Sequence, residues 1–221
     1  IYNMCWNQYV SINTFVFGIF GLLLIAFNNK YSTYKIKLFN NPYAYIFVLS
    51  FIFMQLIEFF LWRNLNNITI NKIMSTLGVL LLYVQPIASL LLLNNIQLRN
   101  KLLLIYSIPT FIFGIYNLFN ANIHTILSPS GHLAWKWTFY NSKFIDFFVK
   151  NFYLFFLFFS LIYNKYYQSI IIFLMYMLFI LYFNKDGSSG SIWCLSVNTI
   201  ILYFLLQILI IMPYNEIIKK R

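Results

Sequence analysis

The sequence has very few charged residues, and this scarcity decides its broad class. Only 9% of its 221 residues are charged and only four are acidic, whereas a soluble globular chain carries roughly 25% charged residues. Seven glycines and two cysteines are also too few for a disordered tail or a disulfide-stabilised secreted scaffold. Because 62% of the residues are hydrophobic, the class that remains is an integral membrane protein.

Long apolar runs separated by polar segments predict an all-α polytopic membrane protein. A helix needs about 20 apolar residues to cross the hydrocarbon core, and the runs are continuous rather than alternating, which argues against a β-barrel. We predict one transmembrane helical domain over residues 1–221, a seven-helix bundle. Its expected spans are Tyr9–Phe27, Tyr43–Trp62, Ile73–Leu93, Leu102–Phe119, Phe144–Tyr163, Gln168–Phe183 and Ser191–Met212.

The net charge of +11 is best explained by the membrane. Lys and Arg lie mostly between the apolar runs, where cations anchor helix ends at lipid headgroups. We therefore expect the lipid bilayer as a partner, and no nucleic acid. Nine of the 15 Lys and Arg residues fall in the first, third and fifth loops and the C-terminal segment, and six fall on the opposite side. This asymmetry predicts an outside N-terminus and a cytosolic C-terminus.

Glu58 is the only acidic residue well inside an apolar run. Gln55, Glu58 and Trp62 follow i, i+3, i+7 spacing, so they share one face of the second span. An intramembrane carboxylate is costly and usually faces a cavity or a partner, which makes Glu58 a candidate functional residue. A purely structural ion pair with Arg63 or Lys150 explains the same position equally well, and both interpretations stay open.

The third span combines a Gln85-Pro86 step with a narrow stripe of small and polar residues. A broken, polar-lined helix is typical of transporter sites, whereas a small-residue stripe is typical of ordinary membrane-helix packing, which we favour. Asn198 in the seventh span lies deep enough to need a hydrogen-bond partner. The stripe of the third span consists of Ser75, Gly78, Leu82, Gln85 and Ser89.

The outward ends of the spans collect the remaining unusual residues. Cys5 and Cys194 are expected at the same membrane face, either as a disulfide or as two free, half-buried thiols. The fourth loop is the longest, and its His132 and Trp135 fit either a folded outer lid or simple interfacial anchoring.

Several short motifs resemble an uncharacterised family of small polytopic membrane proteins. They are the opening Met4-Cys5-Trp6-Asn7, the step Tyr83-Val84-Gln85-Pro86, the acid Glu58 and the segment Gly131-His132-Leu133-Ala134-Trp135. The family occurs in bacteria, algae and large DNA viruses, and its members typically begin with Met-Cys-Trp. The resemblance covers nearly the whole chain and implies no established activity. It implies that Cys5, Trp6, Glu58, Gln85, His132 and Trp135 belong to one site, and the composition favours the viral branch.

These observations predict a channel or transporter for a small solute or ion, with an outward-facing polar and aromatic cavity. The alternative is a non-enzymatic structural or receptor-like protein of a host-cell or viral membrane. No phosphate loop, G-x-S-x-G elbow or HExxH motif occurs, so we expect no cofactor and no metal and assign no catalytic residues. A membrane-embedded enzyme is the less favoured alternative and stays open. Homo-oligomerisation stays open. The expected cavity residues are Glu58, Gln55, Gln85, Asn198, Trp6, Trp62, His132 and Trp135.

Overall fold

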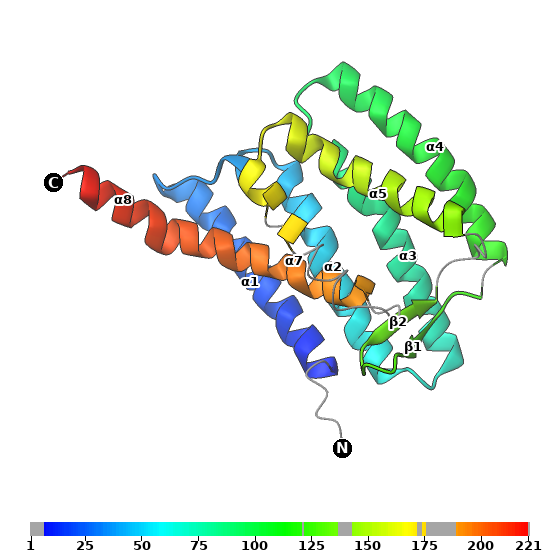
Figure 1. The fold of residues 1–221 in the computed structure, drawn as a ribbon. Helices are drawn as coiled ribbons and strands as arrows, with labels where there is room; N and C mark the ends of the chain where they lie inside the picture. Colours follow the sequence, from blue (N-terminus) through cyan, green and yellow to red (C-terminus); the bar gives the residue numbers. More distant parts are fainter. Residues whose placement is uncertain (1–6, 121, 137–142, 172–173, 176–188, 221) are drawn as a thin grey trace.

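The computed structural model is a bundle of long helices with one small β-hairpin (Figure 1). It describes residues 7–120, 122–136, 143–171, 174–175 and 189–220, without the side chains of 143–146 and 189–197. A π-helical turn, Gln207–Ile211, joins the last two helices. The described helices are α1 (Gln8–Tyr31), α2 (Tyr43–Arg63), α3 (Ile68–Leu90), α4 (Ile96–Asn120), α5 (Lys143–Tyr163), α7 (Ser189–Leu206) and α8 (Met212–Lys219).

Five helices in the described part of the chain are long and apolar enough to cross a membrane. They are α1 to α4 and the continuous segment Asn198–Lys219, while α5 contributes the shorter apolar stretch Phe147–Tyr163. This supports the predicted all-α membrane fold. The predicted sixth span, Gln168–Phe183, lies mostly outside the described residues, so the count of seven spans and their orientation stay predictions.

Asparagine side chains set the starts of three helices. Asn7 accepts hydrogen bonds from the backbone N–H groups of Tyr9 and Val10 at 2.9 and 3.2 Å. Asn67 accepts one from Ile70 at 3.1 Å, and Asn95 accepts one from Leu98 at 3.0 Å. Such caps satisfy N–H groups that have no partner inside the helix. As a result α3 and α4 begin several residues before the apolar runs from which we predicted them.

The apolar core forms around α2, which contacts α1, α3 and α7. Its fully buried members on the helices come from α1, α2, α3, α5 and α7 and include Ile25, Phe51, Ile52, Leu157 and Ile201. A second, smaller cluster holds α4 to the bundle: Leu90, Tyr106 and Phe156 are buried together between α3, α4 and α5. Most of α4 outside this cluster is exposed and apolar, as expected for a lipid-facing helix.

α3 continues as a single α-helix through Pro86. The broken-helix interpretation of the Gln85-Pro86 step is therefore wrong, because the helix absorbs the missing backbone donor without ending. Tyr106 of α4 donates its hydroxyl to the carbonyl of Tyr83 at 3.2 Å, one turn before the proline. A neighbouring helix thus supplies a hydrogen bond close to the point where the backbone lost one.

The predicted fourth loop contains an antiparallel hairpin of β1 (His124–Leu127) and β2 (Leu133–Lys136). Its turn closes with hydrogen bonds from Ser128 N–H to the His132 carbonyl at 2.8 Å and from Gly131 N–H to the Ser128 carbonyl at 2.9 Å. Gly131 has φ of 81°, a conformation that favours glycine. The hairpin contacts α3 and α7, and it lies at the end of the bundle where α2 joins α3, here named the hairpin end (Figure 1).

Candidate functional site

The interior face of α3 carries polar side chains along most of its length. Four of them are buried: Asn71, Ser75, Gln85 and Ser89. The first and last are 18 residues apart, which corresponds to about 27 Å at 1.5 Å per residue, nearly the full ~30 Å of a hydrocarbon core. We call this series, with its partners on α2, α5 and β1, the polar track.

Gln55 and Glu58 of α2 form the only acid-containing pair within the described track. Both side chains are fully buried, and Gln55 Nε2 donates a hydrogen bond to Glu58 Oε2 at 3.2 Å. The predicted shared helix face is thereby confirmed for these two residues. Burying a carboxylate away from water costs free energy unless polar groups surround it. Among the described track residues, this pair therefore carries the largest desolvation cost.

Gln85 connects three helices in the middle of the track. Tyr153 of α5 donates its hydroxyl to Gln85 Oε1 at 2.5 Å, and Gln85 Nε2 donates to the Ser50 carbonyl of α2 at 3.4 Å. Because α2 and α3 run antiparallel, Glu58 lies level with the region of Gly78, about 12 Å from Ser50 along the helix axis. It therefore stands between Gln85 and the hairpin end.

Ser89 lies beyond Gln85, toward the opposite end of the bundle. Its hydroxyl donates to the Leu157 carbonyl at 2.6 Å and lies 2.6 Å from the Ser160 hydroxyl. Small residues let two membrane helices approach closely and bond in this way. The sequence reasoning missed both Tyr153 and Ser160. Both could have been found from the sequence, because each is a polar residue within the apolar run of the fifth span.

The hairpin end of the track is tied to β1. Asn71 Nδ2 donates to the Thr125 carbonyl at 2.8 Å, and Thr125 N–H donates back to Asn71 Oδ1 at 2.9 Å. The hydroxyls of Ser75 and Thr125 lie 2.8 Å apart. All three side chains are buried, so the hairpin is bound onto the start of α3 by neutral hydrogen bonds.

The aromatic residues predicted for the cavity that the structure describes all lie at the hairpin end. Trp62 is half-buried at the last turn of α2. Trp135 is paired with Thr125 across the hairpin and packs against the main core, while His132 lies in the hairpin turn. Cys5 and Trp6 lie outside the described residues, and only the backbone of Cys194 is described, so the disulfide stays a prediction.

Asn198 lies at the crossing of α1, α2 and α7. It is 3% exposed, and its Oδ1 would lie 2.9 Å from a Cβ placed on Gly18, as would Ile52 Cγ1. Gly18 thus brings the backbone of α1 close to Asn198. The structure places Asn198 in the interior, at the depth that the sequence predicted.

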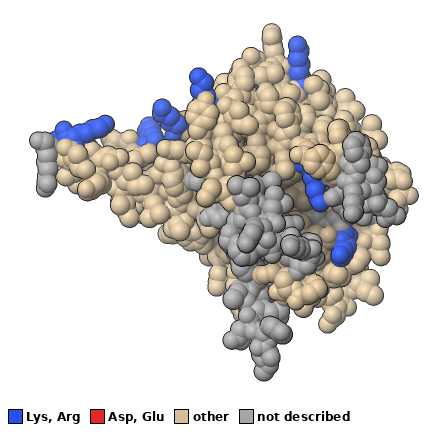
Figure 2. All heavy atoms as spheres, viewed as in Figure 1, with Lys and Arg blue, Asp and Glu red and all other residues tan. Residues whose placement is uncertain are grey.

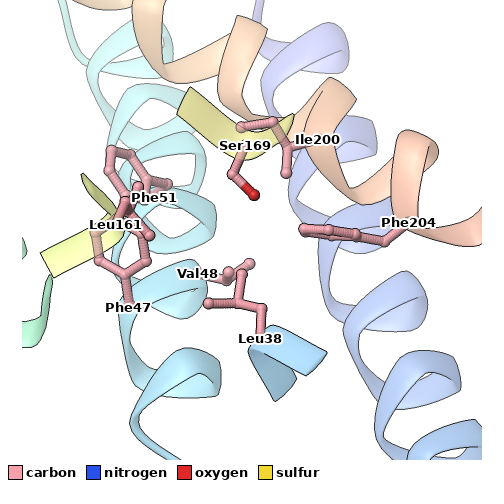
Figure 3. Close-up of a pocket in the computed structure, with 8 residues that line it drawn as sticks. All are labelled: Leu38, Phe47, Val48, Phe51, Leu161, Ser169, Ile200 and Phe204. Carbon is pink, nitrogen blue, oxygen red and sulfur yellow. The ribbon is translucent and has the colours of Figure 1, made fainter. Parts of the chain in front are cut away.

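Two pockets of the described region have linings that contain none of the expected cavity residues. One is an apolar space of about 10 Å³ between α2, α7, the end of α5 and the segments that precede α2 and follow α5 (Figure 3). Its volume is at the lower limit for holding a single water molecule. Neither it nor a larger pocket at the opposite end, described below, is lined by Gln55, Glu58 or Gln85. The eight residues in Figure 3 are Leu38, Phe47, Val48, Phe51, Leu161, Ser169, Ile200 and Phe204.

Comparison with known proteins adds no further constraint on this site. No family model, no curated protein and no solved structure matches the chain. Within the described residues, no three His, Cys, Asp or Glu side chains come together as a metal site would require. Conclusions about function therefore depend on the polar track itself.

Proposed function

We propose that this protein is a membrane channel or transporter for a small ion or solute, with Glu58 as its charged determinant. The observation that supports this proposal is the complete burial of the Gln55–Glu58 pair inside a membrane helix. An ionisable group at such depth typically belongs to a substrate or ion pathway. The proposal includes the predicted seven spans, an outside N-terminus and a cytosolic C-terminus.

The dimensions of the interior favour the smallest substrates. The Gln85 amide is closely packed in the track, since its oxygen accepts from the Tyr153 hydroxyl and its nitrogen donates to the Ser50 carbonyl. Such close packing suits a proton or a small cation better than a sugar or an amino acid. Glu58 would bind the cation or carry the proton, and the hydroxyl and amide groups of α3 and α5 would pass it along the helix.

The experiment is ion flux into liposomes that contain the purified protein. We expect Glu58→Gln to abolish flux, because the amide keeps the size and hydrogen bonding of the side chain but removes its charge. Glu216→Gln is the matched control, since this exposed acid on α8 lies outside the track and should leave flux unchanged. Equal flux in wild type and a folded Glu58→Gln protein would remove Glu58 from the mechanism.

A structural membrane protein is the second candidate, and the bonds of Ser89 and Asn71 favour it. These side chains join α3 to α5 and to the hairpin, which is also how membrane helices are held together without any transport. This candidate predicts that wild type and Glu58→Gln are equally silent in the flux assay. It also predicts a stable larger assembly in mild detergent, measurable by light scattering.

A further inference from the structure

Three chain segments meet at the end of the bundle opposite the hairpin, here named the connection end. Asn41, before α2, donates its Nδ2 to the Leu92 carbonyl at 3.1 Å. Asn164, after α5, donates to the same carbonyl at 3.0 Å. The connections α1–α2 and α3–α4 and the segment after α5 therefore lie together, along the upper edge in Figure 1.

A pocket of about 490 Å³ opens between these segments. Small-molecule sites typically enclose 300–1,000 Å³, so the space is large enough for a headgroup or a small anion. Its polar lining comes from all three segments and consists of Lys37, Asn40, Asn41, Tyr43, Asn94, Arg99 and Tyr166.

The charge of this lining is entirely positive. Lys37 and Arg99 contribute two cations, and no acidic residue lines the pocket. The Arg99 guanidinium lies 6.0 Å from the centre of the Tyr43 ring, close enough for a cation–π contact that orients it. Its Nε is buried and has no hydrogen-bond partner in the described part of the chain. The aromatic ring thus orients Arg99, and N–H groups of its guanidinium can donate hydrogen bonds to a ligand.

The backbone at the start of α4 adds to the positive electrostatic potential of the pocket. α4 begins at the pocket, where Ile96 forms part of the lining, and a helix N-terminus carries a partial positive charge. Further Lys and Arg side chains lie along this edge of the molecule, from the end of α8 to the start of α4 (Figure 2). An anion approaching the connection end therefore meets a favourable potential before it reaches the pocket.

We propose that this pocket binds the phosphate group of an anionic ligand, supplied either by a membrane lipid headgroup or by free phosphate. The planar guanidinium of Arg99 matches a phosphate geometrically, and the amides of Asn40 and Asn94 offer additional donors. Basic pockets between membrane helices are known to hold anionic headgroups. The exposed apolar surface of α4 beside the pocket, with Ile96 60% and Leu104 61% exposed, provides a place for acyl chains.

The test is calorimetric titration of the purified full-length protein in neutral detergent. The probes are dihexanoyl phosphatidic acid, sodium phosphate and, as a zwitterionic reference, dihexanoyl phosphatidylcholine. We expect the double variant Lys37→Gln/Arg99→Gln to weaken phosphatidic acid binding about tenfold or more. The matched control Lys35→Gln/Lys101→Gln removes two exposed cations from the same end outside the pocket, and it should change the Kd less than about twofold.

The probes distinguish the two sources of phosphate. Binding of phosphatidic acid but not of sodium phosphate assigns the site to a lipid, and comparable binding of both assigns it to the phosphate group alone. Arg99→Lys, which keeps the positive charge, should retain part of the affinity even if Arg99→Gln fails to fold. Equal weakening in the two double variants would overturn the proposal in favour of diffuse surface charge, and a wild type that binds none of the probes would overturn it outright.

Discussion

Replacing Gly21 by alanine tests the closest approach between α1 and α7. A Cβ at this position would overlap Ile201 Cγ2 and lie 3.4 Å from Leu205 Cδ1. Ile201 is β-branched and fully buried, so its methyl group cannot swing away without a change of rotamer. Overpacking of this kind costs about 1–3 kcal/mol, while alanine gains about 1 kcal/mol in helix propensity over glycine. We expect a net destabilisation of up to about 2 kcal/mol.

A double-mutant cycle isolates the contact from other effects of the substitution. Ile201→Ala alone should destabilise by about 2–5 kcal/mol, because it leaves a cavity. In the double variant the new methyl group of residue 21 fills part of that cavity, so we expect the pair to be about 1–2 kcal/mol more stable than additivity predicts. Gly114→Ala is the control: its Cβ would meet only the edge of the Tyr83 ring, at 3.1 Å, and the propensity gain should nearly cancel the clash.

The assay is reversible unfolding in mixed micelles with increasing sodium dodecyl sulfate, followed by circular dichroism at 222 nm. Gly21→Ala should unfold at a lower detergent fraction than wild type, and Gly114→Ala at about the same fraction. Strict additivity of Gly21→Ala and Ile201→Ala would refute the reasoning, because residues that do not touch show no coupling. That result would mean that α1 and α7 do not cross at Gly21.

Two further predictions concern the ends of the bundle. Asn71→Ala should destabilise the hairpin by about 1–3 kcal/mol, because it leaves buried backbone groups of Thr125 unsatisfied; proteolysis at the hairpin should accelerate, whereas the exposed control Asn66→Ala should not change it. The Tyr34 hydroxyl donates to Glu216 Oε2 at 2.5 Å, and this hydrogen bond raises the pKa of Tyr34 above its usual 10.0. The contact should therefore hold α8 at neutral pH and be lost as the pH rises through that raised pKa. Amide hydrogen exchange in α8 should show this loss, and Tyr34→Phe should exchange faster already at neutral pH.

Hydropathy was enough to predict the presence of the helices, but it predicted their first residues less accurately. Apolar runs identify the segment that prefers lipid, which is only part of each helix. α3 begins at Ile68 and α4 at Ile96, within segments that hydropathy assigns to loops, because Asn67 and Asn95 cap them. The hydrophobic scale treats these asparagines as breaks, although chemically they start the helix.

In the candidate site, neighbours on one helix could be predicted from the sequence, whereas partners on different helices could not. The i, i+3 spacing of Gln55 and Glu58 was enough to predict that they share one helix face, since neighbours on one face are fixed by helix geometry. The partners of Gln85 and Ser89 lie on α5, and no spacing rule states which faces of two helices meet. Tyr153 and Ser160 would have required a rule that every polar side chain in an apolar run needs a partner on another helix.

The choice of residue at position 58 is the strongest argument against packing alone. A glutamine there could accept the same hydrogen bond from Gln55 and would avoid the cost of burying an ionisable group. Our proposal assigns a role to the charge or the proton of Glu58, and the amide substitution removes that role while it can keep the hydrogen bond from Gln55. For this reason Glu58→Gln separates the two candidate functions more cleanly than any truncation to alanine.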